Sequence, residues 1–239
     1  MDVFIIHPID GSVERGTKVL SHFLNTTKHS IHGIHASNKL IEPCGVTIEG
    51  LALEYAKQIE AKQCFPCFIS GFCVGGVIAL EIARILSKKD IPLAGIGMFD
   101  TPNLLSPDKK ETVLNYWKTH KKQVKRMEKM SYGINPDIVE KQLTITGNFL
   151  MALVEYQPTV FEFNQEVVFF QPEENKLCFD NLDQGDIFNF NPLEKGGWID
   201  LIKSELKIIS ISGRHRNYCK KPHVRVFARE LLNLLNEVS

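Results

Sequence analysis

The sequence predicts an α/β fold: a mostly parallel central sheet flanked by helices. Short apolar runs rich in β-branched residues alternate with longer segments whose apolar residues recur at helical spacing. The apolar runs are continuous rather than alternating, which is typical of strands buried on both faces of a parallel sheet. The chain has 239 residues and is 44% apolar, enough to bury the core of one large domain. We therefore expect a single domain over residues 1–239.

The first half of the chain alternates strictly between the two kinds of element. The first strand, VFIIH, is ended by Pro8 and Gly11, and an apolar pattern of helical period follows it. The predicted strands of this half are 3–7, 31–36, 64–70 and 93–99, and the predicted helices are 12–24, 47–62 and 74–86. This order predicts a sheet covered by helices on both faces.

The alternation breaks between residues 104 and 163, where the sequence is charged, helical in pattern and without strand signals. Strand patterns return at 165–171 and 206–212, with a short predicted helix at 196–206 and a closing helix at 222–238. We expect residues 104–163 to form a mobile helical lid over the carboxyl edge of the sheet, because open α/β sheets bind ligands at that edge.

The stretch FISGFCVGGVIAL, residues 68–80, predicts a strand, a tight turn and a helix with Cys73 at the apex. In such a G-x-C-x-G turn the central side chain projects clear of the sheet, and the glycines let strand and helix cross closely. The start of the following helix stabilises negative charge, which biases a thiol there towards the thiolate. Cys73 is therefore a candidate nucleophile; the alternative is a small buried side chain in a glycine-rich turn.

A nucleophile needs a base, and the base needs an orienting acid. In the α/β-hydrolase arrangement the chain order is nucleophile, acid, histidine. The segment GMFDTP places Asp100 at the end of the next strand, and SISGRHRNY places His215 just past the last strand. The carboxyl ends of parallel strands meet at one edge, so we expect Cys73, Asp100 and His215 to lie together there.

These motifs, taken in order, resemble the thioesterase domains of the α/β-hydrolase superfamily that release products from nonribosomal peptide and polyketide synthases. The acid of that family lies about 27 residues past the nucleophile, as Asp100 does here. Serine is usual at the family's turn, and Cys73 is a minority variant. The matching segments are FIIHPIDGS, GFCVGG, GMFDTPN, GGWIDLIKSELKIISISGRH and PHVRVFARELLNLL.

The resemblance implies acyl transfer through a covalent acyl-enzyme. Cys73 would attack a thioester carbonyl on the phosphopantetheine arm of an acyl or peptidyl carrier protein, with His215 as base and Asp100 fixing its tautomer. The backbone N–H groups of Ile9 and Val74 would form the oxyanion hole. The product would leave by hydrolysis or cyclisation, and the chain would need no metal or cofactor of its own.

Alternatives remain open at this point. In many free-standing relatives the acid sits one strand later, where Glu173 and Glu174 stand; we favour Asp100. The same fold could serve a small-molecule ester or lactone hydrolase, an acyltransferase, or a binding module without catalysis. The insertion 104–163 favours the carrier-protein thioesterase, because a long acyl chain needs a covered channel.

Charge and cysteine usage narrow the setting. A net charge of zero argues against nucleic acid as a partner, and no apolar run is long enough to cross a membrane. The start lacks the pattern of a signal peptide, and six cysteines without framework spacing suggest reduced thiols. We expect a cytoplasmic protein that is monomeric as an isolated domain.

Several other polar residues receive structural interpretations. We expect Cys64 and Cys67 to be core thiols and Asp10 to cap the helix that follows it. The set His29, His32 and His35 lacks partners at metal spacing, and surface or turn roles are expected. His223 is a weaker base candidate than His215. The basic run 118–129 is expected to be a solvated helix face, with a docking patch for an acidic carrier protein as the alternative.

Overall fold

The computed structural model describes residues 1–24, 28–42, 45–103, 109–130, 135–173, 198–213, 217 and 219–239. Its strands are β1 Asp2–Ile6, β2 Ser30–Ile34, β3 Cys67–Phe72, β4 Leu93–Phe99, β5 Val167–Pro172 and β6 Leu206–Ile211. Its helices are α1 Glu14–Leu24, the 3₁₀ turn η1 Asn38–Leu40, α2 Ile48–Glu60, α3 Gly75–Ser87, α4 Lys109–Met130, α5 Pro136–Glu155 and α6 Val224–Glu237.

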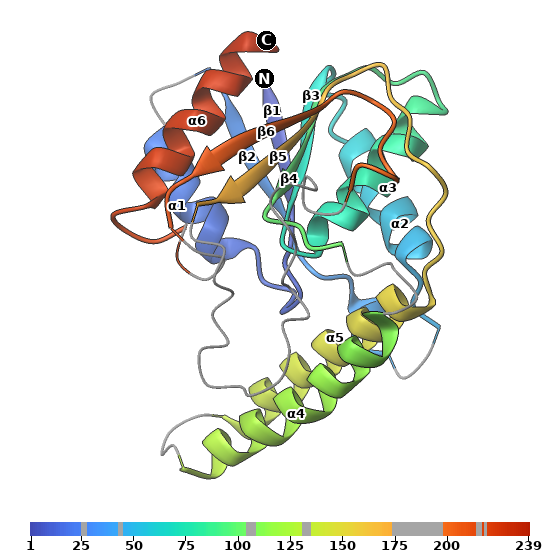
Figure 1. Cartoon of the computed structure of the whole chain (residues 1–239), viewed down its shortest axis with the longest axis vertical. Coiled ribbons are helices and arrows are strands. Elements are labelled where there is room, and N and C mark those ends of the chain that lie inside the picture. The colour runs from blue at the N-terminus through green and yellow to red at the C-terminus, as the bar shows by residue number, and fades with distance from the viewer. Residues whose placement is uncertain are drawn as a thin grey trace.

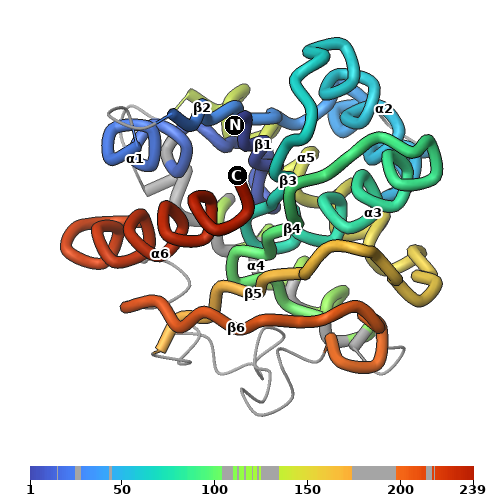
Figure 2. Tube along the Cα trace, turned by 90° about the horizontal axis from the view of Figure 1, so that it is seen from above, coloured from blue at the N-terminus to red at the C-terminus, as the bar shows by residue number. Residues whose placement is uncertain are grey.

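Within the described residues, six strands form one sheet in the order β2-β1-β3-β4-β5-β6, and every neighbouring pair runs parallel. Helices α1 and α6 cover one face, and α2 and α3 cover the other (Figure 1, Figure 2). The expected fold class, a parallel sheet with helices on both faces, is confirmed.

The side chains of the first strand, β1, pack against the helices on both faces of the sheet. Side chains alternate in direction along a strand. Phe4 and Ile6 therefore join the apolar cluster beneath α2 and α3, whereas Val3 and Ile5 join the cluster beneath α1 and α6. All four are buried, so a continuous apolar run is what this strand requires.

Helices α4 and α5 lie side by side beyond the carboxyl ends of the strands (Figure 1). They approach closely where the ring of Trp117 covers Gly147, since a Cβ at Gly147 would come within 2.6 Å of that ring. One side of α5 is anchored in the core through Phe149, Leu150 and Leu153, all nearly inaccessible to solvent. The helical content expected for 104–163 is thus present, and one of its helices belongs to the core.

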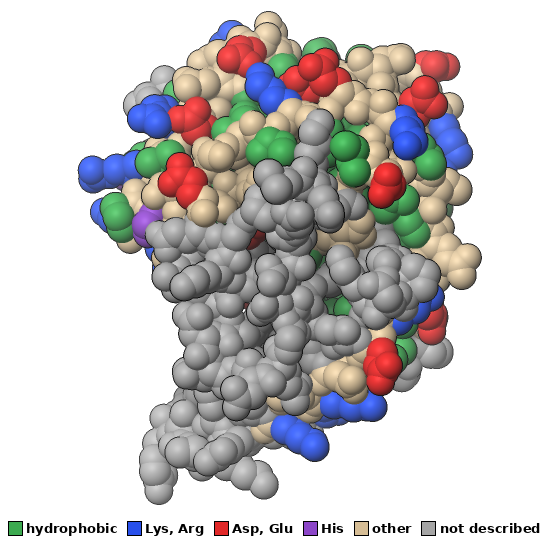
Figure 3. All heavy atoms as spheres, viewed as in Figure 1, with side chains coloured by type: hydrophobic (Ala, Val, Ile, Leu, Met, Phe, Trp, Pro, Cys, Tyr) green, Lys and Arg blue, Asp and Glu red, His purple; other side chains and the backbone are tan. Residues whose placement is uncertain are grey.

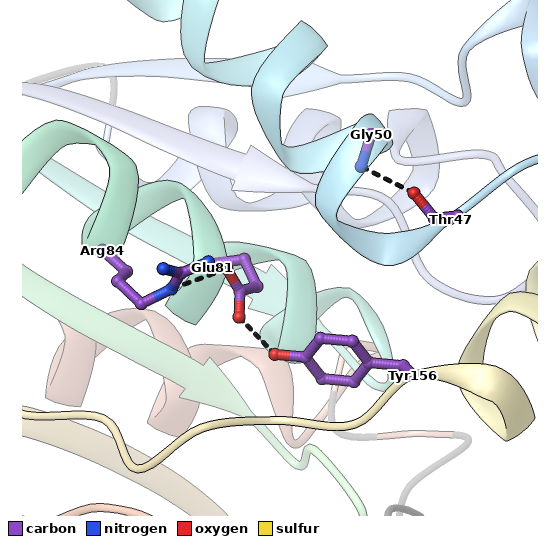
Figure 4. A network of polar contacts seen from close by, with 5 residues as sticks. All are labelled: Thr47, Gly50, Glu81, Arg84 and Tyr156. Atoms are coloured by element: carbon purple, nitrogen blue, oxygen red, sulfur yellow. Dashed lines mark hydrogen bonds and ion pairs between the residues drawn. The ribbon is translucent and has the colours of Figure 1, made fainter.

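Helices α2 and α5 each begin directly after a residue whose side chain caps the helix start. Thr47 precedes α2, and its hydroxyl oxygen accepts the Gly50 N–H at 3.0 Å (Figure 4). Asn135 precedes α5 and accepts the Asp137 N–H at 2.9 Å. Each side chain satisfies one of the backbone donors that a helix start leaves without an intrahelical acceptor.

Two predicted elements differ from the structure. The third strand begins at Cys67 rather than at 64, because Pro66 has no N–H to donate to a neighbouring strand. The helix predicted at 196–206 is absent from its described part, which forms a turn in which the N–H groups of Leu201 and Ile202 both bond the Trp198 carbonyl. The Trp198 ring is fully buried, so its packing, not a helical period, fixes this segment.

Charges of both signs are interspersed over the described side chains on the face shown in Figure 3. Of the basic run on α4, the side chains of Lys118, Lys121 and Lys122 are exposed, as a solvated helix face requires. Among the described helices, none has the length and apolar character needed to cross a membrane.

Candidate active site

The turn between β3 and α3 holds Cys73 in a strained backbone conformation. Its φ is +52°, a left-handed value that non-glycine residues rarely adopt. Its N–H donates to the Phe99 carbonyl at 2.9 Å, which holds the residue in place, and its side chain is 4% exposed. Strain of this kind persists where the surroundings enforce it, and it is concentrated at functional sites.

The glycines of this turn are required by close backbone approach. A Cβ on Gly71 would lie 2.3 Å from the Gly75 carbonyl carbon and oxygen. A Cβ on Gly75 would lie 2.2 Å from the carbonyl oxygen of His7. The turn can therefore form only if these positions lack side chains, and it brings the start of α3 against the end of β1.

Cys73 and Asp100 leave the sheet at neighbouring points. Phe72 and Phe99 are paired between β3 and β4, and each is followed by one of the two candidate residues. Asp100 repeats the geometry of Cys73: its φ is +50°, and its N–H donates to the Phe170 carbonyl at 2.9 Å. The structure thus brings the predicted nucleophile and acid to the same sheet edge, with Asp100 only 3% exposed.

The third predicted member, His215, lies outside the described residues. The chain is described up to Gly213, two residues after β6 ends at Ile211. Of the alternative acids, Glu174 also lies outside them. Glu173 follows β5, is exposed, and its N–H donates to the Ile211 carbonyl at 2.9 Å. The triad as a whole stays a prediction.

The predicted oxyanion donors, Ile9 and Val74, follow the neighbouring parallel strands β1 and β3. Val74 immediately precedes α3, where backbone N–H groups have no intrahelical acceptor. Ile9 is partly buried and packs against the apolar cluster that contains Cys73 and Val74. It belongs to the loop after β1. Strand β1 pairs with β3, and Ile6 at the end of β1 lies opposite Gly71.

Asp10 in the same loop forms a local turn. Its carboxylate accepts the Ser12 N–H at 3.1 Å, and the residue is exposed. The expectation that it caps the following helix is met only in part, because α1 begins at Glu14, two residues beyond the bonded N–H. The Asp10 carbonyl accepts from Gln142 of α5 at 3.0 Å, which ties this loop to the helical insertion.

The sequence analysis did not predict a role for His7, which directly follows β1 and leads into this loop. Its ring is fully buried, with Nδ1 2.7 Å from the Pro8 carbonyl oxygen and Nε2 2.9 Å from the Tyr55 hydroxyl. The Tyr55 oxygen also accepts the Ser37 N–H at 2.8 Å. Burial lowers the pKa of His7 to about 4, so its imidazole is neutral near pH 7. The signal for His7 in the sequence was its position directly before Pro8, at the end of an apolar run.

A buried carboxylate outside the predicted triad joins the insertion to α3. Glu81 is 1% exposed and bonds both Arg84, with Nε at 2.8 Å, and the hydroxyl of Tyr156 (Figure 4). The hydrogen bond to Glu81 raises the pKa of Arg84. The pKa of Tyr156 is raised mainly by burial and further by its hydrogen bond to Glu81. The contact with Glu81 therefore ties Tyr156, the residue after α5, to α3, the helix that follows Cys73.

A surface groove with a volume of about 270 Å³ lies between the loop after β1 and helix α5. Asp10 and Gly11 line one side, and Ile138, Lys141 and Ile145 line the other. Ile138 is 61% exposed, so the groove offers apolar surface to solvent. The groove borders the loop that carries Ile9.

Besides Cys73, the described residues include three thiols: Cys67 is buried, and Cys64 and Cys219 are partly buried. Cys67 is fully buried, and burial raises its pKa to about 12. Burial also raises the pKa of Cys64 and of Cys219. Cys64 and Cys67 are free cysteines. The expectation of a core thiol is confirmed for Cys67, whereas Cys64 is only partly buried against the core because it precedes β3.

Three further histidines among the described residues, His29, His32 and His223, contact polar groups of neighbouring segments. His32 contacts the Asp2 carboxylate at 2.5 Å. His29, in the segment that leads into β2, is 6% exposed and bonds Asn236 of α6, so a surface role is wrong for it; packing against α6 buries it. His223 immediately precedes α6 without a side-chain capping hydrogen bond, and its Nδ1 lies 2.8 Å from the Ser212 hydroxyl.

Comparison with solved structures finds close matches of fold at low identity. The Vlm2 thioesterase domain with genetically encoded 2,3-diaminopropionic acid, bound with a dodecadepsipeptide, is 19% identical with a TM-score of 0.71, over 96% of this chain and 94% of that one. The NocB thioesterase domain from the nocardicin cluster is 16% identical with a TM-score of 0.69, over 98% and 93%.

A four-domain nonribosomal peptide synthetase bound to AMP and glycine also matches, with 20% identity and a TM-score of 0.72, over 98% of this chain and 19% of that one. No curated protein matches. The family model of the thioesterase domain matches residues 1–232. With its parallel sheet and this match, the chain belongs to the thioesterase domain family and is a hydrolase of the α/β-hydrolase fold.

Proposed function

We propose that this thioesterase releases a peptidyl or related acyl chain from a carrier protein's phosphopantetheine arm, through an acyl-enzyme on Cys73. The observation that carries the proposal is the pairing of two strained residues, Cys73 and Asp100, at adjacent strand ends. The family match and the likeness to thioesterase domains of nonribosomal peptide synthesis support the substrate class. One similar structure is a covalent complex of the NocB thioesterase domain with a fluorophosphonate nocardicin G analogue.

In the first half-reaction, His215 takes the Cys73 proton and the sulfur attacks the thioester carbonyl. The resulting oxyanion accepts hydrogen bonds from the Ile9 and Val74 N–H groups. When the tetrahedral intermediate collapses, the bond to the pantetheine sulfur breaks and His215 returns the proton to that sulfur. Loss of one oxyanion donor would cost on the order of 10²–10³ in rate.

In the second half-reaction, water or a nucleophile within the acyl chain attacks the Cys73 thioester. His215 removes its proton and then delivers it to the departing Cys73 sulfur, which restores the enzyme. Water gives a free acid and an internal nucleophile gives a ring. Exchange of one thioester for another is nearly isoenergetic, so this second step supplies the free-energy drop.

Burial favours Asp100 over Glu173 as the orienting acid. An acid that fixes a histidine tautomer acts most strongly where water is excluded, because a lower effective dielectric strengthens the interaction. Asp100 is 3% exposed, whereas Glu173 is exposed. No metal or cofactor enters this scheme.

The helical insertion, residues 104–163, is assigned as the lid over the acyl chain. Ile145 of α5 lines the groove beside the loop of Ile9, and it packs in the same apolar cluster as Cys73. The groove therefore offers a path for the acyl chain along the oxyanion loop. Since α5 is anchored by Phe149 and Leu153, the expected mobility falls on α4 and stays a prediction.

The carrier-protein assignment is tested against a soluble ester. We would incubate the protein with a peptidyl thioester on a carrier protein, and separately with the same acyl group as a simple ester, and measure release and the mass of the adduct. Release from the carrier with an adduct on Cys73 supports the proposal. Preference for the ester would favour a small-molecule hydrolase, and release by neither with no adduct would favour a binding module.

A further inference from the structure

The peptide group that joins Pro8 to Ile9 is held by its carbonyl. The Pro8 oxygen lies 2.7 Å from His7 Nδ1 and also accepts the Gly11 N–H at 3.0 Å. The nitrogen of the same peptide group is the Ile9 N–H, one of the two proposed oxyanion donors. Whatever fixes the Pro8 carbonyl therefore acts on the Ile9 donor.

The hydrogen-bond partners of His7 determine which ring nitrogen carries the proton. The Pro8 carbonyl can only accept, so its 2.7 Å contact places a proton on His7 Nδ1, and the Tyr55 hydroxyl, which also accepts the Ser37 N–H, donates to Nε2. With Nε2 as acceptor, a neutral imidazole carries its proton on Nδ1, and this proton is donated to the Pro8 carbonyl. The Pro8 carbonyl thus requires the Nδ1–H tautomer, and the Tyr55 hydroxyl supports it by donating to Nε2.

A planar trans peptide directs its C=O and N–H in opposite directions. The Pro8–Ile9 bond is not among the cis peptides of the described chain. Building on the proposed function, we propose that His7 is a positioning residue that aims the Ile9 N–H at the oxyanion by holding the Pro8 carbonyl. Hydrogen bonds accepted by a carbonyl also polarise its peptide, which strengthens the N–H as a donor.

Contacts from several elements hold His7 in place, so the Ile9 N–H is oriented before substrate binds. Its ring contacts Tyr55 of α2 and Phe149 of α5, with centroids 5.7 Å and 5.5 Å away. Its N–H donates to the Ile34 carbonyl at 3.1 Å, and its own carbonyl abuts Gly75 at the start of α3. Preorganised donors of this kind give the largest electrostatic gain in acyl transfer, because they need no reorientation during the reaction.

Two substitutions separate the two ring contacts. In His7→Asn the side-chain amide nitrogen can occupy the place of Nδ1 and donate to Pro8. In His7→Gln it reaches the place of Nε2 and leaves the Pro8 carbonyl without this donor. The measurements are single-turnover acylation of Cys73 by a peptidyl thioester and alkylation of Cys73 by iodoacetamide, which forms no oxyanion, together with KM and thermal unfolding.

We expect His7→Gln to slow acylation on the order of 10²-fold, with alkylation within about threefold of wild type and KM little changed. His7→Asn should restore acylation to within about tenfold. Acylation at the wild-type rate in His7→Gln, equal defects in both variants, or a parallel fall of acylation and alkylation would overturn the role of His7. Turnover that survives Cys73→Ala would instead overturn the proposed function, so the two failures are distinguishable.

Discussion

The backbone N–H of Cys73 donates to the carbonyl oxygen of Phe99 at 2.9 Å, so the residue that ends β4 also fixes the turn between β3 and α3. Asp100 follows Phe99 directly and bonds the next strand in the same way. Parallel pairing therefore delivers both candidate residues to one edge without any contact between their side chains being needed to align them.

Cys73→Ala should abolish both acyl-adduct formation and thioester release, because it removes the nucleophile. Cys73→Ser should retain part of the activity, since the same base and backbone donors can serve a hydroxyl. Intact-protein mass spectrometry after brief exposure to a thioester checks the adduct. An adduct that forms on Cys219 in the wild-type protein would show the assignment to be wrong.

Asp100→Asn should lower kcat by roughly 10³–10⁴-fold while leaving the fold intact, because an amide favours the wrong histidine tautomer. Glu173→Gln is the matched control, and it should stay within about threefold of wild type because this residue is exposed. Steady-state kinetics on a carrier-bound or pantetheine thioester measures both. The reverse pattern would move the acid to the end of β5.

Stability should fall as the pH drops from about 6.5 towards 4, because His7 is buried and neutral. The folded pKa is about 4 and the ordinary value is 6.5, so the unfolded state binds more protons within this window. Tyr55 and His35 face this ring or act on it, and neither offers a negative charge near neutral pH that would offset the loss.

The expected loss from His7 is about 2 kcal/mol of unfolding free energy at pH 5 relative to pH 7. Urea unfolding of the wild type and of His7→Asn at both pH values measures it. The variant should lose that much less between pH 7 and pH 5. Equal pH dependence in the two proteins would show that His7 is protonated without cost.

Tyr156→Phe should destabilise the fold by about 1–3 kcal/mol, because Glu81 loses a hydroxyl donor in a site closed to water. The control is Lys89→Ala, which breaks the partly exposed Lys89–Glu60 ion pair and should cost less than about 1 kcal/mol. Denaturant unfolding compares the two. Similar costs for both would mean that the buried contact adds nothing beyond a surface pair.

Ile138→Trp should reduce release of long acyl chains at least fivefold more than release of an acetyl group, because the larger ring narrows the groove beside Gly11. Met151→Trp is the matched control, since Met151 is a partly exposed residue of α5 that does not line the groove. Release rates from thioesters of increasing chain length test this. Equal effects on short and long chains would place the acyl chain elsewhere.

The sequence by itself determined the chain order of the six described strands, the glycine-rich turn at Cys73 and the position of Asp100 at the end of β4. These features are local: glycines at fixed spacing allow only one kind of strand-to-helix turn, and the apolar run of β4 ends where Asp100 begins. The fourth strand agrees with its predicted bounds, 93–99, because its buried residues are contiguous in the chain. Local periodicity is enough wherever one short segment carries the whole signal.

Only the tertiary structure decided the partners of buried polar groups. His7 meets Tyr55 across 48 positions of sequence, and Tyr156 meets Glu81 across 75. The same holds for α5, whose composition predicted a lid but whose Phe149 and Leu153 are buried in the core. A buried group must find its hydrogen bond among whatever residues folding brings beside it. That choice depends on how distant segments pack, which the period of any one segment does not encode.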